Sequence, residues 1–213
     1  SIGRLVGRIT VDDVMDEVRE QAERDYQLAS GLSQDVETDD NVFRQTTARL
    51  PWLLIGMLGG IGNSMILGNF DSTFAAHPEM ALYIPLIGGT GGNVGTQSSA
   101  LVVQGLANSS LNAENTFKQV LKESVVALIN ATIISMLVYI YNFIRFGATA
   151  TVSYSVSISL FAVVMFASIF GTLVPMTLEK LKIDPAIATG PFISITNDII
   201  GMLMYMGITV LLS

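Results

Sequence analysis

GGTGGNVGTQSS, residues 88–99, places glycines, hydroxyls and amides between two apolar segments, MALYIPLI before it and ALVVQGLA after it. Such a run predicts either local unwinding of a helix or very close helix packing. At membrane depth, irregular backbone is tolerated only where protein covers it or where it lines a watery cavity. The role of this stretch therefore depends on whether the chain crosses a membrane.

The composition is that of a membrane protein with an acidic head. Half of the 213 residues are hydrophobic and only 14 % are charged, whereas about 25 % are charged in an ordinary soluble domain. The absence of Cys and the single His77 exclude disulfides, Cys nucleophiles and zinc or haem clusters. Residues 1–47 carry 11 acids and 5 arginines, or −6 of the net −7. An acidic head favours cations as partners and disfavours nucleic acid and anionic lipid.

The rest of the chain contains five apolar segments that are long enough to cross a bilayer, which takes about 20 residues. Six basic residues flank them on one side and only Arg145 lies on the other, so we expect the N-terminus in the cytoplasm and the C-terminus outside. We predict an all-α membrane protein with five transmembrane helices, at 51–70, 80–106, 124–144, within 146–178, and 185–213.

The acidic head precedes these segments. Within residues 1–11, GRLVGRIT alternates like a single β-strand, which has no sheet to join; we expect a remnant of a cytosolic domain. Residues 12–32 are predicted to form an acidic helix, with caps at its start and acids in its first turns. Residues 33–47 are predicted to be a linker, and residues 48–213 the five-helix domain.

One side of the predicted acidic helix carries like charges three and four residues apart, which repel one another. These acids are Asp13, Asp16, Glu17 and Glu20. The pattern is compatible with a solvated acidic face. The alternative is a face that divalent cations neutralise against another acidic surface.

Asp198 is the strongest single indication of function. It lies about midway along the last apolar segment, where a charge is costly and is usually functional. No Lys, Arg or His lies within any of the five segments. Asp198 is therefore either protonated and hydrogen-bonded to a neighbouring helix, or balanced by a cation. Ser194, Thr196 and Asn197 make its surroundings polar.

The glycines of residues 88–95 follow Pro85 and allow two interpretations. Small residues can serve helix packing alone. Alternatively, unwound carbonyls, Asn93 and Gln97 supply hard oxygen ligands for an alkali or alkaline-earth cation or for its waters. The unpaired Asp198 in another segment favours the second interpretation, an ion path.

Several long motifs carry a family resemblance. In order and spacing, RLPWLLIGMLGG, IPLIGGTGGNVGTQSS, LKES and DPAIATGPFISITNDIIGMLMY closely resemble the MgtE family of magnesium channels. The resemblance covers residues 48–213, and GRLVGRITVDDVMDEV is similar to the exit of that family's CBS domain and the start of its plug helix. It implies a homodimer in a bacterial inner membrane, with a pore between the subunits lined by the second and fifth spans. The family's N-domain and most of its CBS pair have no counterpart in these residues.

The resemblance also implies pore ligands for hydrated Mg²⁺. The family's intramembrane aspartate falls on Asp198, its GTGGN asparagine on Asn93, and a pore carbonyl one turn before the aspartate on Ser194. Gly89 completes the candidate set of pore metal ligands.

Regulation by cytosolic Mg²⁺ is implied in the same way. The family's plug helix is clamped to the pore mouth by Mg²⁺, and the matching acids are Asp13, Asp16, Asp25 and Asp184. The chain departs from the family pattern at Arg24, a position that is often acidic, and at Gly190, which can be Asn near the gate.

The expected function is therefore that of a Mg²⁺-selective channel or transporter, not an enzyme, whose partners are Mg²⁺, an identical subunit and the bilayer. Inward flow needs no ATP, because a divalent ion gains about 4.6 kcal/mol per 100 mV. A secondary transporter of an anionic or organic substrate is the alternative, although it lacks an intramembrane cation. An aspartyl hydrolase that uses Asp184 and Asp198 is disfavoured, since one helix would separate them by about 21 Å.

Overall fold

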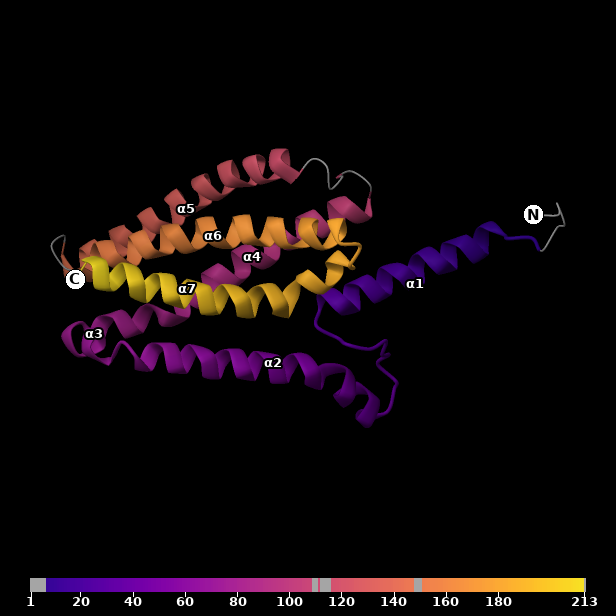
Figure 1. Ribbon diagram of the computed structural model, residues 1–213, viewed down its shortest axis with the longest axis horizontal. Coiled ribbons are helices and arrows are strands. Elements are labelled where there is room, and N and C mark those ends of the chain that lie inside the picture. Colours follow the sequence, from indigo (N-terminus) through magenta and orange to yellow (C-terminus); the bar gives the residue numbers. More distant parts are fainter. Residues whose placement is uncertain (1–6, 109–110, 112–115, 148–150, 213) are drawn as a thin grey trace.

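The computed structural model describes residues 7–108, 111, 116–147 and 151–212, and the regular structure in these ranges is entirely helical (Figure 1). Half of the strand expected within GRLVGRIT, residues 3–6, falls outside the described residues, and residues 7–10 are not in a strand. The elements are α1 (Val11–Ala29), α2 (Val42–Gly68), α3 (Asp71–Ala76), η1 (Pro78–Tyr83), α4 (Ile84–Ala107), α5 (Thr116–Phe146), α6 (Thr151–Lys180), η3 (Pro185–Ala188) and α7 (Gly190–Leu212).

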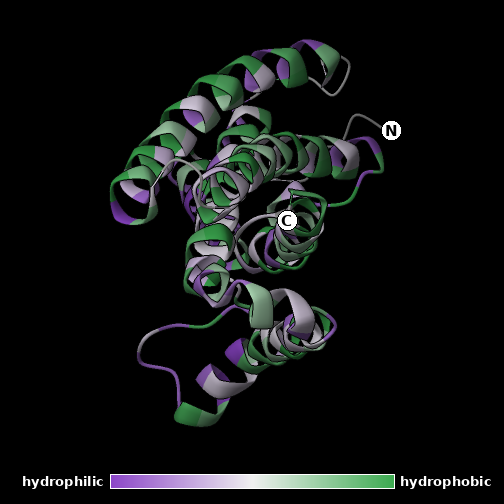
Figure 2. Ribbon diagram, turned by 90° about the vertical axis from the view of Figure 1, so that its left-hand side faces the viewer, coloured by the Kyte–Doolittle hydropathy of each residue, from purple (hydrophilic) through white to green (hydrophobic). Residues whose placement is uncertain are grey.

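Four of these helices are long and apolar enough to cross a membrane: α2, α5, α6 and α7. Hydrophobic residues cover most of the outer helices at the top and bottom of Figure 2, which are α5 and α2. The predicted all-α membrane protein is confirmed. The remaining predicted span, the second at 80–106, corresponds to α4, which has 24 residues but is not among the four, because residues 88–99 lower its hydropathy. Five spans and their orientation remain predictions.

The core is built around α6, which packs against α4, α5 and α7 (Figure 1). Val156, Leu160 and Val163 of α6 are fully buried or nearly so, and they meet Tyr205 of α7 in one hydrophobic cluster. The hydroxyl of Tyr205 donates to the Met80 carbonyl at 2.8 Å, which ties α7 to the turn before α4. The α2 helix packs against α7, and Ile66 and Leu67 near its end pack against the edge of this core.

The acidic helix α1 projects away from the other helices, as Figure 1 shows. Its start is fixed by a capping box, in which Thr10 accepts from the Asp13 backbone and Asp13 accepts from the Thr10 backbone. Its last turn contacts η3, and a Cβ on Gly190 would lie 2.1 Å from the Ala29 carbonyl oxygen. The end of α1 therefore rests on the beginning of α7.

The polar stretch at residues 88–99 is continuous helix in α4. The expectation of local unwinding is wrong, because Pro85 lies in the first turn, where a helix has no backbone hydrogen bond to lose. The expectation of close helix approach is confirmed. A Cβ on Gly171 of α6 would lie 2.4 Å from the Gly95 carbonyl oxygen, so the two backbones are nearly in contact.

Candidate cation site between α4 and α7

Asp198 lies half-buried on α7 and faces two glycines of α4. A Cβ on Gly88 would lie 3.5 Å from its Oδ1, and a Cβ on Gly92 would lie 3.4 Å from the same atom. Among the described residues, no side chain donates a hydrogen bond to Asp198 or forms an ion pair with it. Its carboxylate is therefore not compensated by the part of the chain that the structure describes.

Ser194 lies one turn before Asp198 on the same face of α7. A Cβ on Gly92 would lie 2.8 Å from the Ser194 Oγ, so this glycine accommodates both side chains. Ser194 also lines a cavity of about 640 Å³ between the start of α7 and α2, together with Arg49 and Trp52. The structure thus brings two of the four predicted pore residues together on one glycine of α4.

Asn93 and Gly89 lie on the neighbouring, exposed strip of α4. Among the described residues, the Asn93 side chain has no hydrogen-bond partner, and no atom lies within 4 Å of a Cβ built on Gly89. The described residues also contain no group of three or more His, Cys, Asp or Glu side chains that could hold a metal ion. One chain therefore presents a single carboxylate beside an uncovered polar strip and does not enclose a cation.

Asn197 positions this face of α7, a role that sequence reasoning missed. It is 1 % exposed, and neither its Oδ1 nor its Nδ2 has a hydrogen-bond partner in the described residues. A Cβ on Gly95 would lie 1.9 Å from Nδ2, so the amide fills the space that this glycine leaves. The sequence signal that could have found it was the position of Asn197 next to Asp198. Asn197 lies against Gly95 of α4, just as Asp198 lies against Gly88 and Gly92.

A second buried carboxylate, Glu123 of α5, was also missed. It stands beside Lys122 in the LKES motif, where it reads as the charged boundary of a span. In the structure it is 9 % exposed, and hydroxyls of α4 and α6 donate to it. The signal that could have found it was Ser98, a small polar residue inside the stretch at 88–99.

Two of the four predicted regulatory acids come together just before the start of α7. Asp25 and Asp184 line one cavity of about 410 Å³ with Glu179 and Lys182. Asp25 accepts a hydrogen bond from Gln21 at 2.7 Å, and Asp184 accepts from the first turn of η3 at 2.9 Å. The cavity places one acid of α1 beside one acid at the entrance to α7.

The other two acids, Asp13 and Asp16, lie exposed near the far end of α1. Hydrogen bonds from the Thr10 side chain and backbone hold the pKa of the Asp13 carboxyl below its ordinary value of 3.8. Arg24, which departs from the family pattern, pairs at 3.1 Å with Glu20 on α1 itself. Gly190, the second departure, has a φ of +44° and meets the Ala29 carbonyl, so a side chain there would be strained.

Comparison with known proteins gives one consistent result. Residues 84–208 match the family model MgtE, described as a divalent cation transporter. The chain is 34 % identical to the magnesium transporter MgtE of Bacillus subtilis, over 96 % of this chain and 45 % of the relative. It is 33 % identical to the magnesium transporter MgtE of Thermus thermophilus, over 99 % of this chain and 47 % of the relative. The chain thus spans about half the length of these curated relatives.

The matched residues run from the first turn of α4 nearly to the end of α7 and include both helices of the candidate site. The match and the four long apolar helices identify an integral, multi-pass membrane protein. The chain belongs to the MgtE family of divalent cation transporters.

Proposed function

We propose that this chain forms the membrane pathway of a magnesium transporter, which carries hydrated Mg²⁺ inward down the membrane potential. The observation that carries the proposal is Asp198, an uncompensated carboxylate seated on Gly88 and Gly92 between two membrane helices. The two relatives of this chain named above are magnesium transporters. Mg²⁺ gives up its waters reluctantly, so a few oxygens that read the ion through its water shell suit it better than a closed cage.

The site requires a second copy of the chain to be complete. Asn93 and Gln97 lie exposed on α4, and lipid is a poor neighbour for two amide side chains. A homodimer whose axis passes this strip covers both amides and brings two Asp198 carboxylates to one path. Two carboxylates match the double charge of the ion, with Ser194 and Gly89 as further oxygen donors from each subunit.

The division of the chain into an acidic head and an apolar remainder corresponds to a division of function. Residues 48–213 form the pore domain and cross the membrane five times, with the N-terminus in the cytoplasm. Residues 33–47 link the pore domain to the plug helix at 12–32, and residues 1–11 belong to the cytosolic domain before it. Cytosolic Mg²⁺ closes the path by bridging Asp25 to Asp184, which line one cavity where α1 meets the start of α7.

Competing functions are disfavoured by the same site. An anionic substrate would meet the like charge of Asp198, which forms no ion pair with any Lys, Arg or His among the described residues. An aspartyl hydrolase needs two carboxylates in contact. Here Asp184 caps η3 and lines a cavity with Asp25, whereas Asp198 faces α4. A cation pathway fits the isolated carboxylate best.

Flux of Mg²⁺ into liposomes tests the proposal. Asp198→Asn and Asp198→Ala are expected to abolish flux, because the carboxylate is the charge that attracts the ion, while both variants still fold and dimerise. Asp71→Asn, an exposed acid of α3, is the matched control and is expected to keep the wild-type rate. Wild-type flux through Asp198→Asn would refute the pore assignment. Thermal protection by substrate-like anions but not by Mg²⁺ would favour the alternative transporter.

A further inference from the structure

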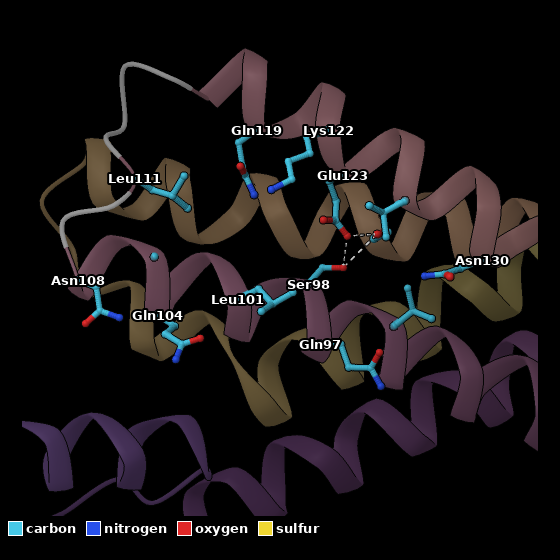
Figure 3. Close-up of a pocket in the computed structure, with 14 residues that line it drawn as sticks. Gln97, Ser98, Leu101, Gln104, Asn108, Leu111, Gln119, Lys122, Glu123 and Asn130 are labelled. Carbon is cyan, nitrogen blue, oxygen red and sulfur yellow. Dashed lines mark hydrogen bonds between the residues drawn. The ribbon is translucent and has the colours of Figure 1, made fainter.

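A polar groove lies between α4 and α5 (Figure 3), and Asp198 is not among the residues that line it. Both helices pack along α6, and the space between them is a cavity of about 590 Å³ with Ser168 of α6 in its lining. Figure 3 shows Ser98 of α4 and Glu123 of α5 pointing toward each other across this space. Apart from Gln97, which also belongs to the strip assigned to the ion path, the residues that line the groove have no part in that path.

Only one of the two carboxylate oxygens of Glu123 accepts hydrogen bonds from the described residues. The hydroxyls of Ser98, at 2.6 Å, and of Ser168 both donate to the same oxygen, Oε1. Among the described residues, nothing donates to Oε2. A buried carboxylate with one oxygen held by hydroxyls and the other free toward a cavity is a ready acceptor for a cationic donor.

Lys122, the preceding residue, lines the same cavity. It forms no ion pair with Glu123 or with any other acid in the described ranges of the chain. One cation and one anion therefore face a common space without neutralising each other. The remaining described lining is made of amides and aliphatic side chains, with no aromatic ring: Val94, Gln97, Leu101, Gln104, Asn108, Gln119, Val126 and Asn130 are among its members.

Lys122 and Glu123 directly precede the apolar segment at 124–144, so the groove opens at the charged edge of that predicted span. A lipid that enters the groove meets both charges at this edge.

We propose that this groove binds a phospholipid whose headgroup carries a primary ammonium, as in phosphatidylethanolamine. The ammonium donates to Glu123 Oε2, the phosphate pairs with Lys122, and the acyl chains lie along Val94, Leu101 and Val126. The lipid thereby adds to the direct contact between α4 and α5, which the hydrogen bond from Ser98 to Glu123 already makes.

The lining argues against the other common headgroups. A choline cannot donate a hydrogen bond to Glu123, and quaternary ammonium sites are typically aromatic cages, which the described lining does not provide. Phosphatidylglycerol offers a phosphate to Lys122, but its glycerol hydroxyls are neutral donors and bring no positive charge to Glu123. A primary ammonium beside a phosphate gives each of the two residues a charged partner.

Thermal unfolding of the full chain in detergent, with added lipids of matched acyl chains, tests the proposal. Phosphatidylethanolamine is expected to raise the Tm more than phosphatidylcholine or phosphatidylglycerol does. Glycerophosphoethanolamine, which lacks the acyl chains, is expected to have no comparable effect. Equal stabilisation by phosphatidylethanolamine and phosphatidylcholine would overturn the proposal, and so would equal stabilisation by the soluble headgroup.

Variants separate the groove from the rest of the membrane surface. Glu123→Gln and Lys122→Gln are each expected to need about tenfold more phosphatidylethanolamine for the same shift, the equivalent of one charge-assisted hydrogen bond. Lys118→Gln, an exposed lysine of α5 outside the groove lining, is the matched control and is expected to respond as wild type does.

Because Lys122 is exposed, its variant decides the question even if Glu123→Gln fails to fold. A wild-type lipid response in Lys122→Gln would overturn the proposal. A change of oligomeric state in both variants without any dependence on lipid would also overturn it, since the groove would then hold a second copy.

Discussion

The helices α2 and α4 show opposite relations between apolarity and burial. The most apolar stretch of α2 meets the criterion for a membrane span, yet only 6 % of it is buried. In contrast, α4 carries the polar stretch at 88–99, is not among the four apolar spans, and packs against both α6 and α7. Within a bilayer, lipid is as apolar as leucine, so small and polar residues, not apolar ones, indicate where helices meet.

The glycines of the two helices make the same contrast at atomic scale. In α4, a Cβ on Gly91, Gly92 or Gly95 would come within 3.0 Å of a neighbouring side chain. In α2, a Cβ on Gly60 would meet nothing within 4 Å, although Gly59 closely approaches Ile195 of α7. Glycine therefore marks a helix contact only where another element is present to use the space.

The largest effect on stability is expected at the contact between α4 and α6. Gly171→Ala would place a methyl group 2.4 Å from the Gly95 carbonyl oxygen, which is backbone and cannot rotate away. We expect a loss of about 3 kcal/mol, at the upper end for overpacking, seen as a lower Tm in detergent. An unchanged Tm would mean that α4 and α6 are farther apart than described, and the contrast with α2 would fail.

A smaller effect on stability, but a clear one on transport, is expected on the exposed strip of α4. Asn93→Leu removes an amide that has no hydrogen-bond partner among the described residues, so stability should change by less than about 1 kcal/mol. Liposome flux of Mg²⁺ should nevertheless fall several-fold, because the ion path loses an oxygen ligand. Full flux in Asn93→Leu would place this strip against lipid, as α2 is.

The smallest effect is expected on α2. Gly60→Ala fills open space and raises helix propensity, which in an exposed helix is worth up to about 1 kcal/mol. We expect a Tm equal to or slightly above that of wild type, measured in parallel with Gly171→Ala. A marked loss of stability would show that another segment or subunit packs against α2 at Gly60. The difference in burial between α2 and α4 would then be smaller than the single chain suggests.

The helical class, the long apolar helices and the close approach at 88–95 could be predicted from sequence because they follow from hydropathy and from side-chain size. The continuity of α4 could not, since glycines and a proline permit both a bent and a straight helix until their neighbours are known. Glu123 was missed for a related reason: its place beside Lys122 indicates a span boundary, whereas its burial depends on serines of two distant segments. Asp13 was predicted to be a metal ligand, and the structure adds that Thr10 occupies its carboxylate.

The contact between Ala29 and Gly190 connects the end of α1 directly to the first residue of α7. Asp198 lies eight residues beyond Gly190 on the same uninterrupted helix, about 12 Å along its axis. Because no loop intervenes, nothing between the end of α1 and the carboxylate can absorb a displacement. A displacement of the acidic helix at this glycine would therefore reach Asp198 as a tilt or rotation of α7 relative to Gly88 and Gly92.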